Sequence, residues 1–153
     1  MTFLNYFRSV LIRKAVGLDP AQLSATIGSS TLTIGGIVKH MAFVEDHWLH
    51  HVLLGNEYPE PWASADWAAS PDWEFDTARH DPPTELLAQF RAGVTRSDAA
   101  IGSVTDLDTL AARRTGDQPT NLRWILVHMI EEYARHCGHA DLIREAVDGR
   151  TGD

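Results

Sequence analysis

Apolar residues recur every three or four positions in four separate stretches of this 153-residue chain. This spacing places them on one face of a helix, whereas a half-buried strand would show strict alternation. The stretches cover approximately residues 3–16, 34–54, 83–103 and 120–147. No convincing strand or internal repeat lies between them. Four amphipathic helices in so short a chain predict an all-α fold, a four-helix bundle, with residues 1–153 as a single domain.

Residues that commonly begin and end helices bound two of these stretches. Thr33 is the expected N-cap of the second helix, and Gly55 is expected to end it. For the fourth helix we expect Thr120 as the N-cap and Gly149 as the residue that ends it. The 56–82 segment between the second and third helices is the longest stretch with no helical pattern.

Charge and cysteine content exclude several classes of protein. The net charge is −8, and the largest basic cluster is the pair Arg113-Arg114, so the sequence predicts binding neither to nucleic acid nor to an anionic membrane. No apolar run approaches the roughly 18 residues that a membrane span needs. Cys137 is the only cysteine, which excludes an intrachain disulfide and favours a reducing cytoplasmic location. We expect its thiol to be buried and structural.

The segment HMIEEYARHCGH, residues 128–139, carries three histidines and two adjacent glutamates. On a helical wheel, His136 turns into the apolar face and Glu132 lies at its margin, while His128 and His139 lie further out. Glu132 and His136 are four positions apart, so a carboxylate and an imidazole lie on the same face and can bind one cation. A buried, hydrogen-bonded histidine with no metal is the alternative interpretation.

Two residues of one helix do not complete a metal site, so a third ligand must come from a facing helix. His40, His47 and His51 share one margin of the apolar face of the second helix. Helical spacing alone does not choose among these three histidines.

The stretch LRWILVHMIEEYARHCGHADLIRE, with IVKHMAFVEDHW upstream, resembles the DinB-like superfamily. It is more closely similar to an actinobacterial branch of mini-circle-protein-like sequences, and the similarity covers nearly the whole chain. Eleven arginines against two lysines also fit a GC-rich coding sequence of that origin. The resemblance implies a four-helix bundle, a divalent metal that is most often zinc or nickel, and a homodimer.

Matched position by position, the resemblance implies that His40, Glu132 and His136 are the metal ligands. A glutamate among two histidines resembles the mycothiol-dependent maleylpyruvate isomerase. His139 stands where glutamine is usual, which makes it a possible further ligand or proton carrier.

These inferences predict a thiol-dependent enzyme with mycothiol as a possible cosubstrate. A metal with open coordination positions would deprotonate the thiol, which then attacks a small electrophile in an S-transfer or isomerisation. His139 or His128 would move protons. The alternatives are a metal-dependent hydrolase and a non-catalytic, stress-related metal-binding bundle.

Three tryptophans are candidates for binding the substrate. Trp48 lies on the second helix, and Trp62 and Trp67 lie in the following irregular segment, which could form a wall of the pocket. Packing of this segment across the end of the bundle, or at a dimer contact, is the alternative.

Overall fold

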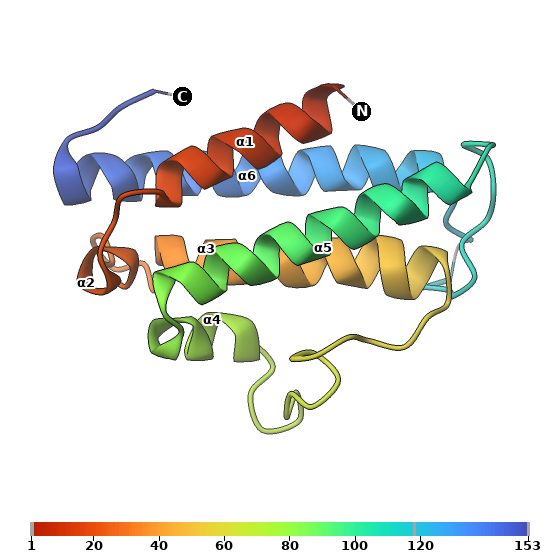
Figure 1. Cartoon of the computed structure of the whole chain (residues 1–153), viewed down its shortest axis with the longest axis horizontal. Helices are drawn as coiled ribbons and strands as arrows, with labels where there is room; N and C mark the ends of the chain where they lie inside the picture. Colours follow the sequence, from red (N-terminus) through yellow and green to blue (C-terminus); the bar gives the residue numbers. More distant parts are fainter. Residues whose placement is uncertain (1, 118, 153) are drawn as a thin grey trace.

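Four long helices dominate the computed structural model, which describes residues 2–117 and 119–152 (Figure 1). Their bounds are α1 Thr2–Ala15, α3 Ile34–Glu45 with its continuation η1 Asp46–Leu53, α5 Pro83–Ser103, and α6 Leu122–Asp148. The short elements are α2 Pro20–Leu23, α4 Trp73–Thr77 and η2 Ala78–His80. Across the described ranges the only β-type pairing is an isolated bridge between Leu110 and Asn121. The predicted all-α bundle is therefore confirmed.

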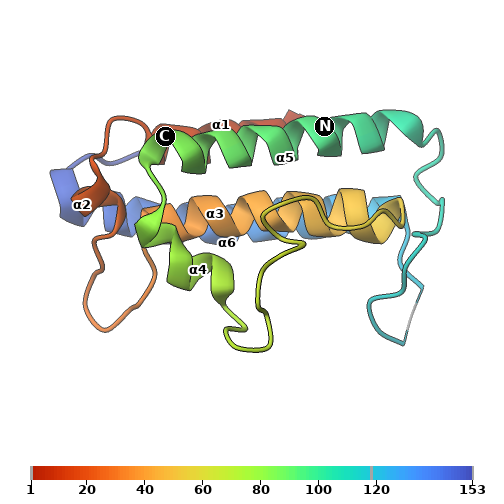
Figure 2. The same ribbon diagram turned by 60° about the horizontal axis from the view of Figure 1, so that its bottom comes forward.

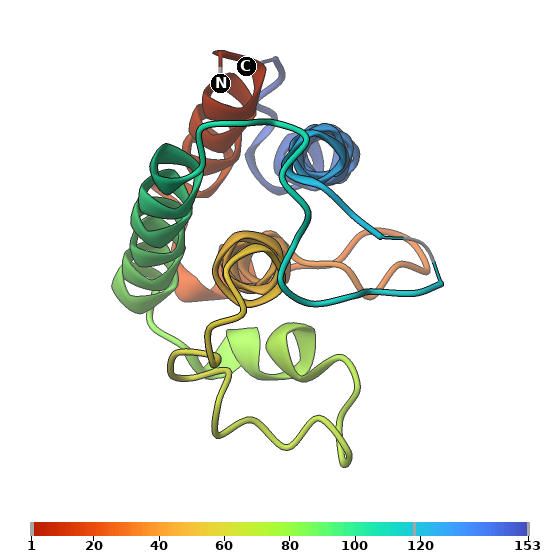
Figure 3. The ribbon, with the colours of Figure 1, turned by 90° about the vertical axis from the view of Figure 1, so that its right-hand side faces the viewer.

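The four long helices run side by side along the longest axis of the molecule (Figures 1 and 2). The most extensive contacts join α3 to α5 and α1 to α6. Seen along that axis, α3 and α6 are neighbours, and α4 lies against the side of α3 that faces away from α1 (Figure 3). This arrangement brings the second and fourth predicted helices together along one side of the bundle.

The core consists of the apolar faces that the helical spacing predicts. Leu11, Ile37, Met41, Ile125 and Met129 have no measurable exposure to solvent. Burial of each such side chain stabilises the fold by roughly 1.5–3 kcal/mol. Helix α3 is the central element, because it contacts α1, α5, α6 and α4.

The helix ends agree with the sequence at three points and differ at one. The Thr33 hydroxyl accepts a hydrogen bond from the Gly36 amide at 2.9 Å, as expected of an N-cap. Gly149 ends α6 in the left-handed conformation, with φ of 77°. The N-cap of α6 is Asn121 and not Thr120, because Asn121 accepts from the Trp124 amide at 2.9 Å. Like Gly149, Gly55 has a positive φ where its helix ends.

The second predicted helix is continuous but changes its winding at Asp46. The part from Asp46 to Leu53 is a π-helix, in which the turns are wider than in an α-helix. A wheel drawn at α-helical spacing therefore holds for α3 and does not hold for residues 46–53.

The segment 56–82 differs from the irregular stretch that the sequence indicated, since it contains α4 and η2. A buried cation fixes these elements to α3: the Lys39 Nζ atom lies 2.5 Å from Asp81 Oδ2 and 2.8 Å from the Thr77 hydroxyl. The same Nζ atom lies 4.4 Å from the centre of the Trp73 ring. As a result, α4 has a fixed position beside α3.

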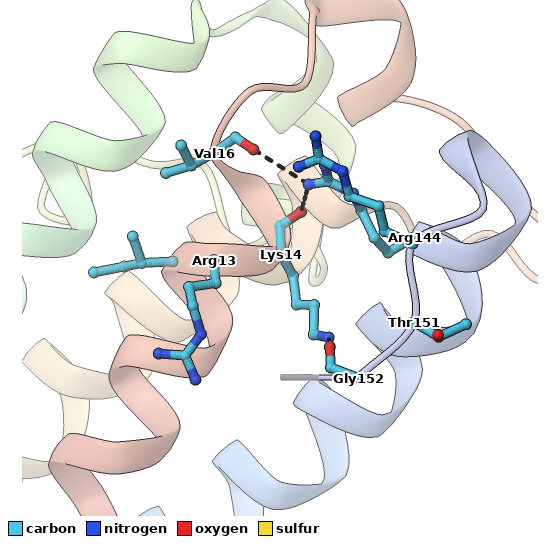
Figure 4. Close-up of a pocket in the computed structure, with 8 residues that line it drawn as sticks. Arg13, Lys14, Val16, Arg144, Thr151 and Gly152 are labelled. Carbon is cyan, nitrogen blue, oxygen red and sulfur yellow. Dashed lines mark hydrogen bonds between the residues drawn. The ribbon is translucent and has the colours of Figure 1, made fainter.

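Arg144 joins α6 to the C-terminal end of α1 (Figure 4). Its Nη1 atom donates to the carbonyl oxygens of Lys14 at 2.7 Å and Val16 at 3.2 Å. Lys14 lies in the last turn of α1 and Val16 directly follows the helix, where carbonyl groups lack helical partners, so the guanidinium group caps α1. A cavity of about 440 Å³ at this end of the bundle is lined in part by Lys14, Val16 and Arg144.

Candidate metal centre

Three side chains from two helices come together on one side of the bundle. His40 extends from α3, and Glu132 and His136 extend from adjacent turns of α6. One nitrogen or oxygen atom of each lies within 4.8 Å of the others. The imidazole rings of His40 and His136 have centroids 4.8 Å apart, and Glu132 Oε2 lies 3.4 Å from His136 Nε2. The structure thus brings together the three residues that the resemblance indicated.

The other two histidines of the second helix make contacts elsewhere. His47 Nδ1 lies 2.6 Å from the Tyr58 hydroxyl, and His51 Nδ1 lies 2.7 Å from the carbonyl oxygen of Asn56. Both rings also stack on Tyr58. Of the three candidates that helical spacing left open, His40 is therefore the one that reaches His136.

Glu74, which the sequence analysis did not identify, positions the His40 ring. Its Oε1 atom lies 2.9 Å from His40 Nδ1, and the carboxylate is buried. A histidine held at one ring nitrogen by a carboxylate presents the other nitrogen in a fixed direction, which is the usual arrangement behind a metal-binding imidazole. Phe75 fixes the plane of the same ring by stacking on it, with centroids 4.7 Å apart.

Burial and neighbouring charges set the protonation state of His136. Burial, together with the nearby imidazoles of His40 and His139 and the Arg135 guanidinium group, lowers its pKa to about 4. The ring is therefore neutral at pH 7, which is the form that binds a metal. Its Nδ1 atom is buried and has no hydrogen-bond partner among the described residues.

The donor set fits a catalytic divalent cation. Two imidazoles and one carboxylate form a common set in zinc enzymes, where a fourth position stays open. The side chains of His40, Glu132 and His136 are 19%, 15% and 9% exposed, so each remains partly accessible to solvent. A second group, His128 with Glu131 and Glu132, is equally close, but Glu131 is exposed and paired with Arg135.

His139 and His128 lie on opposite sides of this centre along α6. The ring of His139 is 5.4 Å from that of His136, and its Nδ1 atom is buried with no partner within the described part of the chain. His128 stacks on Trp124 at 5.0 Å, and its Nε2 atom lies 4.0 Å from Glu132 Oε1. Both histidines therefore border the centre without completing it.

The three tryptophans have different positions. Trp48 lies 4.7 Å from the His128 ring, at the edge of the candidate centre. Trp62 is buried and donates from Nε1 to Asp46 at 2.8 Å, and Trp67 donates to the Trp62 carbonyl oxygen at 3.2 Å. Both contact Phe43, and the 56–82 segment reaches His40 through Glu74 and Phe75 of α4.

Cys137 lies on the far side of α6 from this centre. It is buried, and its Sγ atom lies 3.7 Å from the carbonyl oxygen of Phe7 in α1. This position agrees with the structural role that the sequence predicted.

Helical bundles often carry a metal-binding site that is built from side chains of facing helices. The two histidines and the glutamate give this protein a candidate site of that class. The family described as Mycothiol-S-transferase matches residues 1–149, and the chain belongs to this family. The membership agrees with the resemblance to DinB-like proteins. No curated protein matches the chain.

A solved structure shows that the fold itself is shared. It is titled a conserved protein of locus from Enterococcus faecalis, and it superposes with a TM-score of 0.73 over 97% of this chain and 95% of that one. The sequences are 16% identical, so this likeness concerns the fold alone. Among the described residues, no helix has the length and apolar character to cross a membrane.

Proposed function

We propose that this protein is a divalent-metal-dependent S-transferase or isomerase that joins mycothiol to a small electrophile. The proposal rests on one observation above all, the convergence of His40, Glu132 and His136 at a partly exposed position. Membership of the Mycothiol-S-transferase family supports the choice of thiol.

His40 and Glu132, with His136, would hold the cation, and zinc or nickel suits imidazole donors. When bound, a divalent cation lowers the pKa of a thiol and so provides a sulfur nucleophile at neutral pH. Glu74 holds the His40 ring so that Nε2, and not Nδ1, faces the centre. Phe75 stacks on one face of that ring and limits its rotation.

His139 accepts the proton that the thiol loses, because its Nδ1 atom is buried close to the centre and has no partner among described residues. The sulfur then forms a bond to the electrophilic carbon. In a substitution, the leaving group departs with its bonding electron pair and takes up the proton from His139. His128, on the other side of Glu132, and Trp48 border the position of the electrophile.

Metal content and thiol dependence test this proposal together. We expect one metal ion per chain in the wild type and in the matched control His50→Ala, and a large loss of metal in His136→Ala. Alkylation of mycothiol by monochlorobimane, followed by fluorescence, should proceed in the first two proteins and fall to background in His136→Ala.

Two results would contradict the proposal. Turnover of an ester or amide substrate that needs no thiol would indicate a metal-dependent hydrolase. Sub-stoichiometric metal that His136→Ala leaves unaltered, with no thiol transfer, would indicate a non-catalytic bundle.

A further inference from the structure

A cavity of about 570 Å³ lies beside the candidate metal centre, at the N-terminal end of α3. Its walls are the 24–33 segment between α2 and α3 and one face of α4, which lie on the same side of the bundle (Figure 2). Phe75 lines this cavity and also stacks on His40. Phe75 therefore lies between this cavity and the His40 ring of the candidate centre.

Five residues with hydroxyl groups line the 24–33 side of this cavity. They are Ser24, Thr26, Ser30, Thr31 and Thr33. The hydroxyls of Ser30 and Thr33 accept hydrogen bonds from the backbone of their own turns. Those of Ser24, Thr26 and Thr31 bond to no other residue in the described ranges, so they are available to a ligand.

The opposite wall carries two carboxylates and one guanidinium group, from Asp72, Asp76 and Arg79. Asp76 accepts a hydrogen bond from Ser70 at 2.5 Å, and Arg79 forms no ion pair within residues 2–117 and 119–152. An anionic ligand would meet both carboxylates, and an apolar ligand would leave the hydroxyls unpaired. Carboxylates, guanidinium groups and hydroxyls together suit a neutral ligand with many hydroxyl groups.

We infer that this cavity binds the sugar-like part of the thiol cosubstrate, an inference that rests on the proposed function. Mycothiol carries its thiol on an N-acetylcysteinyl group, which is amide-linked to a glucosamine–inositol pseudodisaccharide. With the pseudodisaccharide between the 24–33 segment and α4, the cysteinyl group passes Phe75 and its sulfur reaches the centre at His40. A cavity of this size is within the usual range for a small-molecule site.

Equilibrium binding of the thiol-free glucosaminyl-inositol, measured by calorimetry, tests this inference without any catalytic step. The double variant Thr26→Val/Thr31→Val removes two hydroxyls and keeps the side-chain shape. We expect its affinity to fall at least about tenfold, as the loss of two hydrogen bonds to a ligand implies. The matched control Thr84→Val/Thr105→Val, whose residues are exposed outside the cavity, should bind as the wild type does.

Kinetics separate a failure of this inference from a failure of the proposed function. With mycothiol as donor, Thr26→Val/Thr31→Val should raise KM about tenfold and leave kcat unchanged, whereas with N-acetylcysteine both constants should stay at wild-type values. Equal binding of the pseudodisaccharide by this variant and the wild type would overturn the inference and leave thiol transfer intact. If His136→Ala still binds the pseudodisaccharide but no longer transfers the thiol, the result would support both the inference and the proposed function.

Discussion

Glu74 is the residue whose role in the metal centre can be tested most directly. Its carboxylate holds His40 Nδ1 at 2.9 Å and touches no other part of the proposed ligand set. Glu74→Ala would free the ring to rotate, and loss of such an orienting group typically lowers metal affinity 10–100-fold. We expect a fall of about this size in a zinc titration against a chromophoric chelator.

The conservative variant Glu74→Gln separates positioning from charge, because its amide oxygen can still accept from His40 Nδ1–H. We expect Glu74→Gln to retain most of the zinc affinity, and the exposed control Glu85→Ala to retain all of it. Wild-type affinity in Glu74→Ala would show that stacking on Phe75 alone fixes the His40 ring.

His47 makes the stability of the fold depend on pH. Burial, together with the imidazoles of His51 and His128, lowers its pKa to about 4. The unfolded chain binds this proton near pH 6.5 and the folded chain does not, so stability is complete above pH 6.5 and is lost as pH falls towards 4. The free energy of unfolding, measured by urea with a chelator present, should fall by about 2 kcal/mol between pH 7 and pH 5 from this group.

The matched variants for this test are His47→Gln and His80→Gln. His47→Gln keeps a polar partner for Tyr58 and should remove most of the loss that His47 causes, whereas the exposed His80→Gln should leave the pH profile unchanged. An unaltered profile in His47→Gln would show that other groups cause the acid sensitivity.

The sequence predicted part of the candidate centre at the level of single residues. Glu132 and His136 were predicted from one helix, because spacing along a helix fixes which side chains share a face. His40 needed the resemblance, since residue spacing does not fix how two helices are aligned along their axes. Glu74 was missed because its position depends on how α4 folds back onto α3, and no local pattern specifies that.

At the scale of helices, Gly93 allows α5 to approach α3 closely. A Cβ atom at this position would lie 3.1 Å from the Ala42 carbonyl oxygen and 3.4 Å from Glu45 Cβ, both on α3. Gly93→Ala gains up to about 1 kcal/mol of helix propensity but forces two helices apart, which typically costs about 1–3 kcal/mol. We expect a net loss of unfolding free energy, measured by urea denaturation.

Gly102 provides the matched control within the same helix. A Cβ atom there would meet no atom within 4 Å, so Gly102→Ala should stabilise the protein by a few tenths to about 1 kcal/mol. If Gly93→Ala stabilised the protein as much as Gly102→Ala, α3 and α5 would have room to separate.

The sequence predicted where the helices begin and end better than it predicted their winding. Capping residues gave the start of α3, the end of η1 and both ends of α6 to within one residue, because a cap is a local interaction. The π-helix from Asp46 to Leu53 was not predicted, since apolar spacing of three to four residues is compatible with either winding over two turns. This change of winding means that a wheel drawn at α-helical spacing misplaces His47 and His51, which lie in the π-helical part.

At the scale of the whole molecule, one buried ion pair connects all four long helices. Arg8 of α1 donates to both carboxylate oxygens of Glu45 in α3, at 2.7 and 2.6 Å, and to Asp98 of α5 at 2.7 Å. The Tyr133 hydroxyl of α6 donates to Glu45 at 2.5 Å. Burial alone would lower the pKa of Arg8, but its hydrogen bond to Glu45 raises that pKa above its usual value.

Removal of Arg8 should therefore cost more than removal of the whole charge pair. Arg8→Met leaves the Glu45 carboxylate buried without a counter-charge, which costs about 3–5 kcal/mol, whereas Arg8→Met/Glu45→Gln leaves a neutral amide that still accepts from Tyr133. A double-mutant cycle by urea unfolding should give a coupling energy of about 2 kcal/mol or more. The exposed pair Arg123–Asp108, treated in the same way, should give less than about 1 kcal/mol.

The same cycle tests whether this ion pair also fixes the metal centre. Glu45 lies on α3 between the turns that carry His40 and Trp48, and Tyr133 follows Glu132 directly on α6. If the pair sets the alignment of α3 against α6, Arg8→Met should weaken zinc binding as well as folding, and Arg8→Met/Glu45→Gln should restore part of both. Zinc affinity that stays at the wild-type value in folded Arg8→Met would show that apolar packing alone aligns the two helices.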